Sequence, residues 1–153
     1  MTEQVYMSSQ KLEEIKLELI DRKSKIRKEI AERIANAKEL GDLSENFEYH
    51  EAKEAQGMNE MRVAEIEAMI KNAVIVEEKT GGGAISIGAS FTAKINGDTK
   101  HFSIVGPHEA DPLVGKISNE SPIGRAFLGT KTGDKVEVDT PSGKVVYEIQ
   151  KVD

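Results

Sequence analysis

The chain has 153 residues, of which 38% are hydrophobic, a size that allows one or two small domains. It contains no Cys and no Trp, so disulfides and thiolate metal sites are excluded. Its 21 basic and 27 acidic residues give a formal net charge of −6, and the acidic excess lies in residues 1–78. A net-acidic segment binds free nucleic acid poorly, because such binding relies on clustered Lys and Arg. Without an apolar run of about 18 residues or a signal-peptide pattern, we expect a cytoplasmic protein that contacts no membrane.

Residues 8–40 contain no Gly or Pro and carry apolar residues at helical spacing, which predicts one long helix. The stripe comprises Leu12, Ile15, Leu19, Ile26, Ile30, Ile34 and Ala37. Its steps change from seven to four after Ile26, which predicts a shift of the seam in mid-helix.

A basic cluster on the same helix comprises Arg22, Lys23, Lys25, Arg27, Lys28 and Arg33. Asp21, Glu29 and Glu32 are interspersed among these cations. We therefore interpret the cluster as a solvated face with intrahelical ion pairs, rather than as a nucleic-acid patch.

Residues 42–73 predict a second helix whose stripe follows the seven-residue repeat of a coiled coil. The stripe comprises Tyr49, Ala52, Gln56, Asn59, Val63, Ile66, Ile70 and Ala73. Two helices that each expose one stripe are expected to pack together as an antiparallel hairpin. Gln56 and Asn59 are polar seam positions that either fix the register or open a groove near the tip.

The turn between the helices, residues 41–48, is acidic. Gly41 is suited to the left-handed backbone just past a helix end. Asp42 with Glu45 three residues later is the acidic form of a capping box, and this is what the pattern alone favours. The alternative is that the two carboxylates, on one side of a helical turn at the tip, hold a divalent cation.

Beyond residue 78 the pattern changes. The glycine-rich residues 80–84 predict a flexible junction, and alternating apolar residues predict strands over residues 89–95, 100–105, 135–138 and 145–149. Residues 121–129 predict one short helix, with Ser121 as the N-cap and Pro122 at the first position. The fold class is therefore α+β, a helical hairpin followed by an antiparallel sheet with one helix.

The sequence around the turn, from Ala37 to Asn46 and from Glu48 to Lys53, closely resembles the signature of the GreA/GreB family of bacterial transcript-cleavage factors. A second stretch, from Gly106-Pro107 through Ser121-Pro122 to Thr140-Pro141, resembles the C-terminal half of that family. The resemblance covers most of residues 37–153. Residues 1–30 match less well, since Arg27-Lys28 stands where the family often has Arg-Pro, which removes a possible kink.

The resemblance implies a coiled-coil hairpin over residues 1–78 with its acidic tip at residues 41–48. It also implies a globular domain over residues 79–153, similar in fold to FK506-binding proteins, that docks on bacterial RNA polymerase. The hairpin would then enter the secondary channel of the polymerase. There it would stimulate the polymerase's own cleavage of the 3′ end of backtracked RNA and rescue arrested complexes. The expected state is a monomer.

The resemblance also assigns roles to single residues. Asp42 and Glu45 would donate ligands to a Mg²⁺ ion shared with the polymerase, so the chain is an accessory factor that binds no metal stably alone. Asn46 and Tyr49 would orient the tip. Lys38 and Lys53 would steer RNA, unless they are only solvated. Finally, Ser121 and Pro122 would contact the polymerase; Ser44 receives no role.

Three other functions remain open. A non-cleaving regulator of the same channel would have the hairpin but an altered tip. A prolyl isomerase or chaperone would need an aromatic-lined pocket, although aromatic residues are only 5% of the chain. A coiled-coil adaptor would leave the tip carboxylates and the second domain without a role. His50, His101 and His108 show no metal-ligand spacing.

Overall fold

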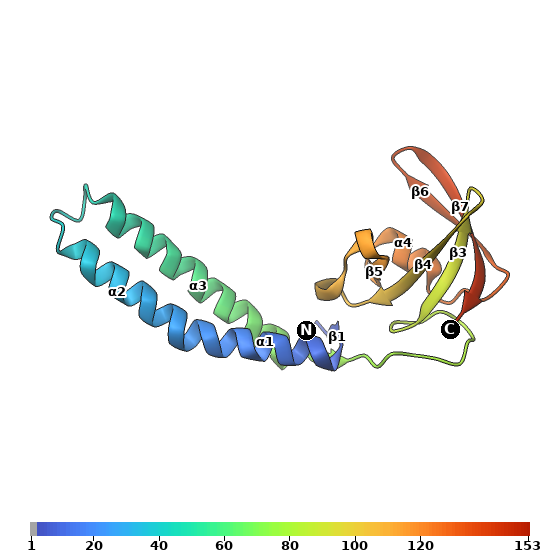
Figure 1. The fold of residues 1–153 in the computed structure, drawn as a ribbon, viewed down its shortest axis with the longest axis horizontal. Coiled ribbons are helices and arrows are strands. Elements are labelled where there is room, and N and C mark those ends of the chain that lie inside the picture. Colours follow the sequence, from blue (N-terminus) through green and yellow to red (C-terminus); the bar gives the residue numbers. More distant parts are fainter. Residues whose placement is uncertain (1–2) are drawn as a thin grey trace. The chain divides into compact units, whose positions relative to one another are not determined.

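The computed structural model describes residues 3–153, which form two compact units (Figure 1). One unit is the helical hairpin, Leu12–Ala73. The other, the globular unit, combines Glu3–Lys11 with Val74–Asp153. Within the described residues, no helix is long and apolar enough to cross a membrane.

The first arm of the hairpin is one continuous helical run, as predicted. It consists of α1 (Ser9–Asp21), a π-helical turn (Arg22–Ile26) and α2 (Arg27–Lys38). A π turn inserts extra chain into the helix and rotates the residues that follow. The predicted mid-helix shift of the seam takes the form of this turn, which ends at Ile26.

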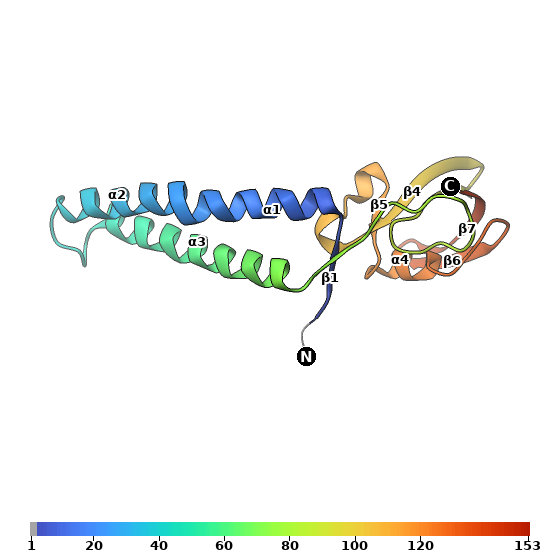
Figure 2. The same ribbon diagram turned by 90° about the horizontal axis from the view of Figure 1, so that it is seen from below.

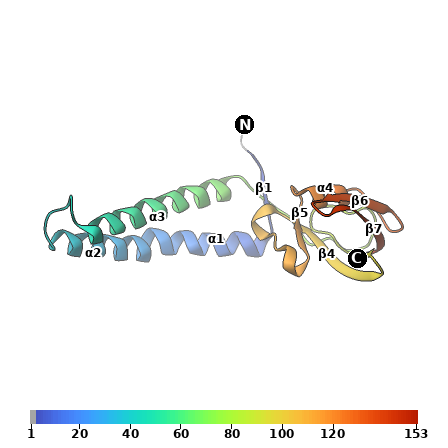
Figure 3. The ribbon, with the colours of Figure 1, turned by 90° about the horizontal axis from the view of Figure 1, so that it is seen from above.

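The second arm is α3 (Phe47–Lys71), which lies beside the first arm near the tip and diverges from it toward the base (Figures 2 and 3). The residues buried in the seam are Ile15, Ile30, Ala37, Ala52, Asn59, Val63, Ile66 and Met69. All except Met69 belong to the two predicted stripes. The arms therefore pack through the seam that the periodicity indicates.

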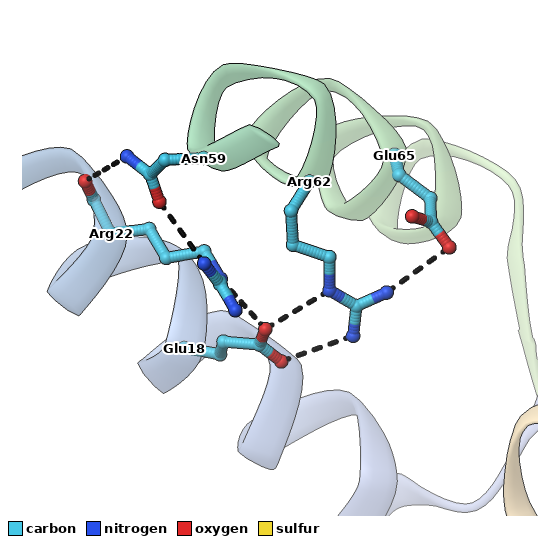
Figure 4. Close-up of polar contacts among 5 residues, drawn as sticks. All are labelled: Glu18, Arg22, Asn59, Arg62 and Glu65. Carbon is cyan, nitrogen blue, oxygen red and sulfur yellow. Dashed lines mark hydrogen bonds and ion pairs between the residues drawn. The ribbon is translucent and has the colours of Figure 1, made fainter. Parts of the chain in front are cut away.

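A polar network crosses the seam at the π turn (Figure 4). The side chain of the buried Asn59 donates to the Arg22 carbonyl at 3.2 Å and accepts from the Arg22 guanidinium at 3.1 Å. Glu18 accepts hydrogen bonds from Arg22 at 2.8 Å and from Arg62 at 3.0 Å. Asn59 thus pairs with one position of the facing arm, as a residue that fixes the register does. An open groove of about 560 Å³ also borders Asn59.

The basic cluster of the first arm pairs differently from our prediction. Arg22 does pair within its helix, but Arg27 forms a bidentate ion pair with Glu60 of the other arm, at 2.7 and 2.8 Å. Lys23 likewise reaches Glu67 at 2.8 Å. These cations join the two arms because their neighbours across the seam are acidic.

The globular unit is built on a five-stranded sheet in the order β5-β4-β3-β7-β6. Its strands are β3 (Ser90–Ile95), β4 (Asp98–Val105), β5 (Lys116–Ser118), β6 (Lys135–Thr140) and β7 (Gly143–Val152). The four predicted strands are confirmed and pair antiparallel, but β5 was not predicted and pairs parallel with β4. Two 3₁₀ turns, Pro107–Glu109 and Pro112–Val114, precede β5.

The core of this unit is aromatic. The helix α4 (Pro122–Phe127) contributes Phe127, whose ring packs against Phe91 at a centroid distance of 4.9 Å and against Tyr147 at 5.2 Å. Phe102 contacts the same three rings. The rings fill the core themselves, and Phe91 and Phe127 are fully buried.

The N-terminal segment also belongs to the globular unit. Strand β1 (Val5–Met7) pairs with β2 (Ala73–Ile75), and Met7 is fully buried. Gly106 allows close packing, because a Cβ atom there would overlap the Tyr6 carbonyl oxygen. The Glu109 carboxylate accepts hydrogen bonds from the Ser8 backbone N–H and hydroxyl, at 2.8 and 2.6 Å.

The boundary between the two units therefore differs from the predicted one, which lay between residues 78 and 79. The structure groups residues 3–11 and 74–78 with the globular unit. Residues 80–84 are not the predicted junction between units, since they lie inside the globular unit and the Gly82 N–H donates to the Asp153 carbonyl at 3.0 Å.

The network at the π turn gives the hairpin an acid-sensitive component. Hydrogen bonds from Arg62 and Arg22 lower the pKa of Glu18 from 4.5 to about 2. Because this pKa is lower in the folded state, the ionised carboxylate stabilises the hairpin above pH 4.5, and its contribution is lost as the pH falls toward 2.

We therefore expect Glu18→Gln to lower the free energy of unfolding at pH 7 by about 1–2 kcal/mol, a value reduced for solvent screening. Urea unfolding followed by circular dichroism at pH 7 and pH 3 measures this. The difference between variant and parent should shrink at pH 3. Glu13→Gln is the control, because Glu13 forms only an exposed pair with Lys16 at 3.6 Å. An equal loss for Glu18→Gln at both pH values would contradict the assignment.

Candidate functional site at the hairpin tip

The tip is the loop between the last residue of α2, Lys38, and the first residue of α3, Phe47. Asp42 and Glu45 both lie on this loop and are exposed. Gly41 adopts a positive φ of 128°, which accords with the predicted helix end. The fold thus presents two carboxylates where the chain reverses direction.

Asp42 does not cap the second helix, so that prediction is wrong. Its Oδ1 instead accepts hydrogen bonds from the Ser44 backbone N–H at 3.0 Å and from the Ser44 hydroxyl at 2.9 Å. This is a local turn in which the carboxylate bonds to the chain two residues on. The Glu45 carboxylate makes no hydrogen bond to other described residues, although its backbone N–H donates to the Asp42 carbonyl at 3.3 Å. No capping box therefore forms between the two acids.

The N-cap of α3 is Asn46. It has extended backbone angles, and its Oδ1 accepts from the Tyr49 backbone N–H at 3.0 Å. Its Nδ2 donates to the Ala37 carbonyl near the end of α2, at 2.6 Å. One side chain thus satisfies a backbone group on each arm and closes the loop.

The predicted orienting residues differ in what they do. Asn46 bonds the backbone on both sides of the tip but does not bond Asp42. The half-buried Tyr49 meets the His50 ring edge-on at 5.6 Å, and among residues 3–153 its hydroxyl bonds nothing. Ser44, for which no role was predicted, is the residue that orients Asp42. The Asp-Leu-Ser spacing is the signal that could have identified this turn.

The electrostatics of the tip favour an ionised Asp42. The Ser44 backbone N–H and hydroxyl stabilise the carboxylate and lower the pKa of Asp42 below its ordinary value. The other three carboxylate oxygens, Asp42 Oδ2 and both of Glu45, accept no hydrogen bond from the described residues. Carboxylate oxygens of this kind suit a hard cation such as Mg²⁺.

The pair is nevertheless too small a ligand set to hold a metal unaided. In the part of the chain that the structure describes, no three His, Asp or Glu side chains gather closely enough to bind a metal ion. Mg²⁺ usually takes one or two protein carboxylates and completes its shell with water and substrate phosphate. Asp42 and Glu45 fit the role of partial ligands completed by another molecule.

Lys38 and Lys53 are exposed on the two arms next to the tip. The ammonium group of Lys53 donates to Gln56 Oε1 at 2.8 Å, whereas Lys38 has no partner within residues 3–153. Both remain available to a phosphate, because an exposed amide contact is readily exchanged.

Ser121 and Pro122 lie in the globular unit and hold the positions predicted for them. The Ser121 hydroxyl accepts from the Gly124 backbone N–H at 3.1 Å and donates to the Ser118 carbonyl at 2.7 Å, so it caps α4. Pro122 is the first residue of that helix and is exposed. Its ring is accessible to a partner.

Comparison with known proteins gives matches over nearly the whole chain. A family model described as "Transcription elongation factor, N-terminal" matches residues 5–75, and one described as "Transcription elongation factor, GreA/GreB, C-term" matches residues 79–153. The chain is 46% identical over 154 residues to transcription elongation factor GreA of Alkaliphilus oremlandii, covering 97% of this chain and 96% of that protein.

Transcription elongation factor GreA of Bacillus subtilis is 43% identical over 148 residues, covering 95% of this chain and 94% of that protein. Among solved structures, GreA factor homolog 1 of Thermus thermophilus is 26% identical, with 99% of each chain covered and a TM-score of 0.44.

The hydrogen bonds predict which tip residue stabilises the fold. We expect Asn46→Ala to lower the free energy of unfolding by about 0.5–2 kcal/mol, because it removes the cap of α3. Asn46→Asp keeps the acceptor but loses the donor to Ala37, so its effect should be smaller. Asp42→Ala should stay within about 0.5 kcal/mol of the parent. Urea unfolding followed by circular dichroism measures all three, and a larger loss for Asp42→Ala than for Asn46→Ala would contradict the cap.

Proposed function

The chain belongs to the GreA/GreB family of transcription elongation factors, and from this premise we propose that it stimulates RNA polymerase to cleave backtracked RNA. In this proposal the hairpin enters the secondary channel of a bacterial polymerase and brings its tip to the active site. The polymerase performs the endonucleolytic cleavage at the RNA 3′ end, which frees an arrested complex. The chain itself is an accessory factor and not an enzyme.

The observation that carries this proposal is the pair of exposed carboxylates on the loop that joins the two arms, in which only Asp42 Oδ1 accepts hydrogen bonds, both from Ser44. Neither Asp42 nor Glu45 stabilises the helix that follows, because Asn46 fulfils that task. Their oxygens are therefore available to a ligand without loss of the fold.

The chain's own residues would position these oxygens. Ser44 holds one oxygen of Asp42 through two hydrogen bonds, so the other oxygen is presented outward. Asn46 fixes the loop between the arms and limits the directions that Glu45 can take. When bound, Mg²⁺ would supply an activated water and charge stabilisation for phosphodiester hydrolysis.

Two lysines support contact with RNA. Lys38 and Lys53 flank the tip on opposite arms and can each neutralise one phosphate. The hairpin as a whole is acidic, so these contacts are local and depend on the polymerase to deliver the RNA.

The globular unit would supply the affinity for the polymerase, with Ser121 and Pro122 at the start of α4 as the contact region. The competing isomerase function has less support, because the four aromatic rings pack against one another in the core rather than lining a pocket. A non-cleaving regulator would have the same shape, and the tip variants below distinguish it.

The tip carboxylates are tested by substitutions that change their chemistry and keep their size. Asn can still accept the Ser44 hydrogen bonds, so Asp42→Asn and Glu45→Gln should leave thermal stability and polymerase binding unchanged. A neutral amide is a poor ligand for Mg²⁺. We expect each variant to slow RNA cleavage by more than about 100-fold, since even groups that only orient a metal ligand change activity by about 10- to 100-fold.

The assay uses stalled polymerase complexes with RNA length as the readout. Glu51→Gln, an equal change at an exposed carboxylate farther along α3, is the matched control and should cleave like the parent. Cleavage that survives both tip substitutions would show that the carboxylates are not ligands, and a parent that binds without cleaving would identify a non-cleaving regulator.

Docking through α4 is tested with Pro122→Glu. The side chain is exposed and Glu is favourable in a first helical turn, so the free energy of unfolding should change by less than about 1 kcal/mol. A charged side chain in a docking surface should weaken polymerase binding by about tenfold or more, measured by competition with the labelled parent protein. Cleavage should recover at high concentrations of the variant. Unchanged affinity would remove α4 from the interface.

A further inference from the structure

Phe47 stands apart from the other phenylalanines of the chain. Phe91, Phe102 and Phe127 are 0–7% exposed in the core of the globular unit, whereas Phe47 is 75% exposed at the hairpin tip. Leu40 at 71% and Leu43 at 38% are exposed on the same loop. Single exposed apolar residues are common, but Leu40 and Phe47 line one hollow together, which suits a contact.

The fold gives Phe47 no packing role. It is the first residue of α3, two residues before the seam begins at Tyr49, and no other ring contacts it within the described chain. Its position next to the N-cap can be filled by almost any residue. The reason for a large aromatic side chain here therefore lies outside the hairpin.

Phe47 and the two tip carboxylates line one hollow. An open hollow of about 330 Å³ at the tip is lined by Leu40, Asp42, Glu45, Asn46, Phe47 and Glu48. Carboxylates and apolar side chains therefore border one space, and a molecule in it can contact both kinds of group. Under the proposed function, that molecule is the extruded end of the RNA.

The chemistry of the hollow selects a nucleobase as the occupant. Its carboxylates take up a phosphate only through a bound cation, so the apolar side chains are left to an uncharged, flat surface. An unpaired base offers such a surface and stacks on aromatic side chains with little dependence on sequence. We propose that Phe47, with Leu40 beside it, is a stacking platform for an unpaired base of the extruded RNA 3′ end; this inference rests on the proposed function.

The test compares full-length variants on stalled complexes whose extruded RNA carries either an ordinary 3′ nucleotide or an abasic one. Phe47→Ala should slow cleavage of ordinary RNA by about 5- to 100-fold, the range that base–aromatic stacking contributes. Phe47→Tyr should cleave like the parent. On abasic RNA the parent should be slowed similarly and Phe47→Ala no further. Leu17→Ala, at an apolar residue 67% exposed on α1, is the matched control and should have no effect.

Two results would overturn the platform. One is parent-like cleavage of ordinary RNA by Phe47→Ala. The other is that Phe47→Ala slows cleavage of abasic RNA, relative to the parent, by as much as it slows cleavage of ordinary RNA. That result would place the ring against the polymerase.

A fluorescence readout separates this inference from the proposed function. With 2-aminopurine at the RNA 3′ end, stacking should quench the emission when the parent or the cleavage-deficient Asp42→Asn variant is added, but not with Phe47→Ala. Quenching that depends on Phe47 without any cleavage by the parent would refute the proposed function and keep the platform. Absence of quenching by the parent would refute the platform itself.

Discussion

Two helices that pack against each other as a pair bury one narrow seam, and this constraint governs the hairpin from base to tip. The seam buries few large side chains, so polar groups contribute much of the specificity. The Asn59 side chain bonds to the Arg22 carbonyl at the π turn, which ties the register of one arm to an irregularity in the other. Ion pairs between Arg27 and Glu60 and between Lys23 and Glu67 reinforce the same alignment from outside the seam.

At the tip, the hydrogen bonds that hold the loop and the exposed carboxylates belong to different residues. Asn46 provides the bonds that the loop needs, one to each arm. The carboxylates of Asp42 and Glu45 therefore make no hydrogen bond to either helix that a bound cation would disturb. A carboxylate that capped the helix would have to exchange that bond for a ligand, and the arrangement seen here avoids the conflict.

Much of the architecture could be predicted because it depends on local patterns. The two apolar stripes indicated nearly every buried seam residue. Between β3 and β4 lies Asn96-Gly97, a dipeptide typical of a tight hairpin turn, and both residues have positive φ. The helix start at the tip was misplaced because Asp and Asn are equally good caps, and the sequence offers both. Only the contact with Ala37 across the turn favours Asn46.

Other features were missed because their partners are distant in the chain. Strand β5 has three residues and is defined by its parallel pairing with β4. Glu109 joins Ser8 from 101 positions away, which no local pattern reveals. The proposed ligand role of Asp42 and Glu45 came from the family resemblance, since spacing alone favoured a cap.

The strand order of the sheet has a consequence for the order of folding during synthesis. The last strand to leave the ribosome, β7, lies between β3 and β6, so the sheet remains split until nearly the whole chain has been made. The contacts between the arms of the hairpin join segments that emerge early and are nearer in the chain than β3 and β7. Contacts between nearer segments form faster than distant ones. The hairpin can therefore be complete while the globular unit still lacks the strand that joins β3 to β6.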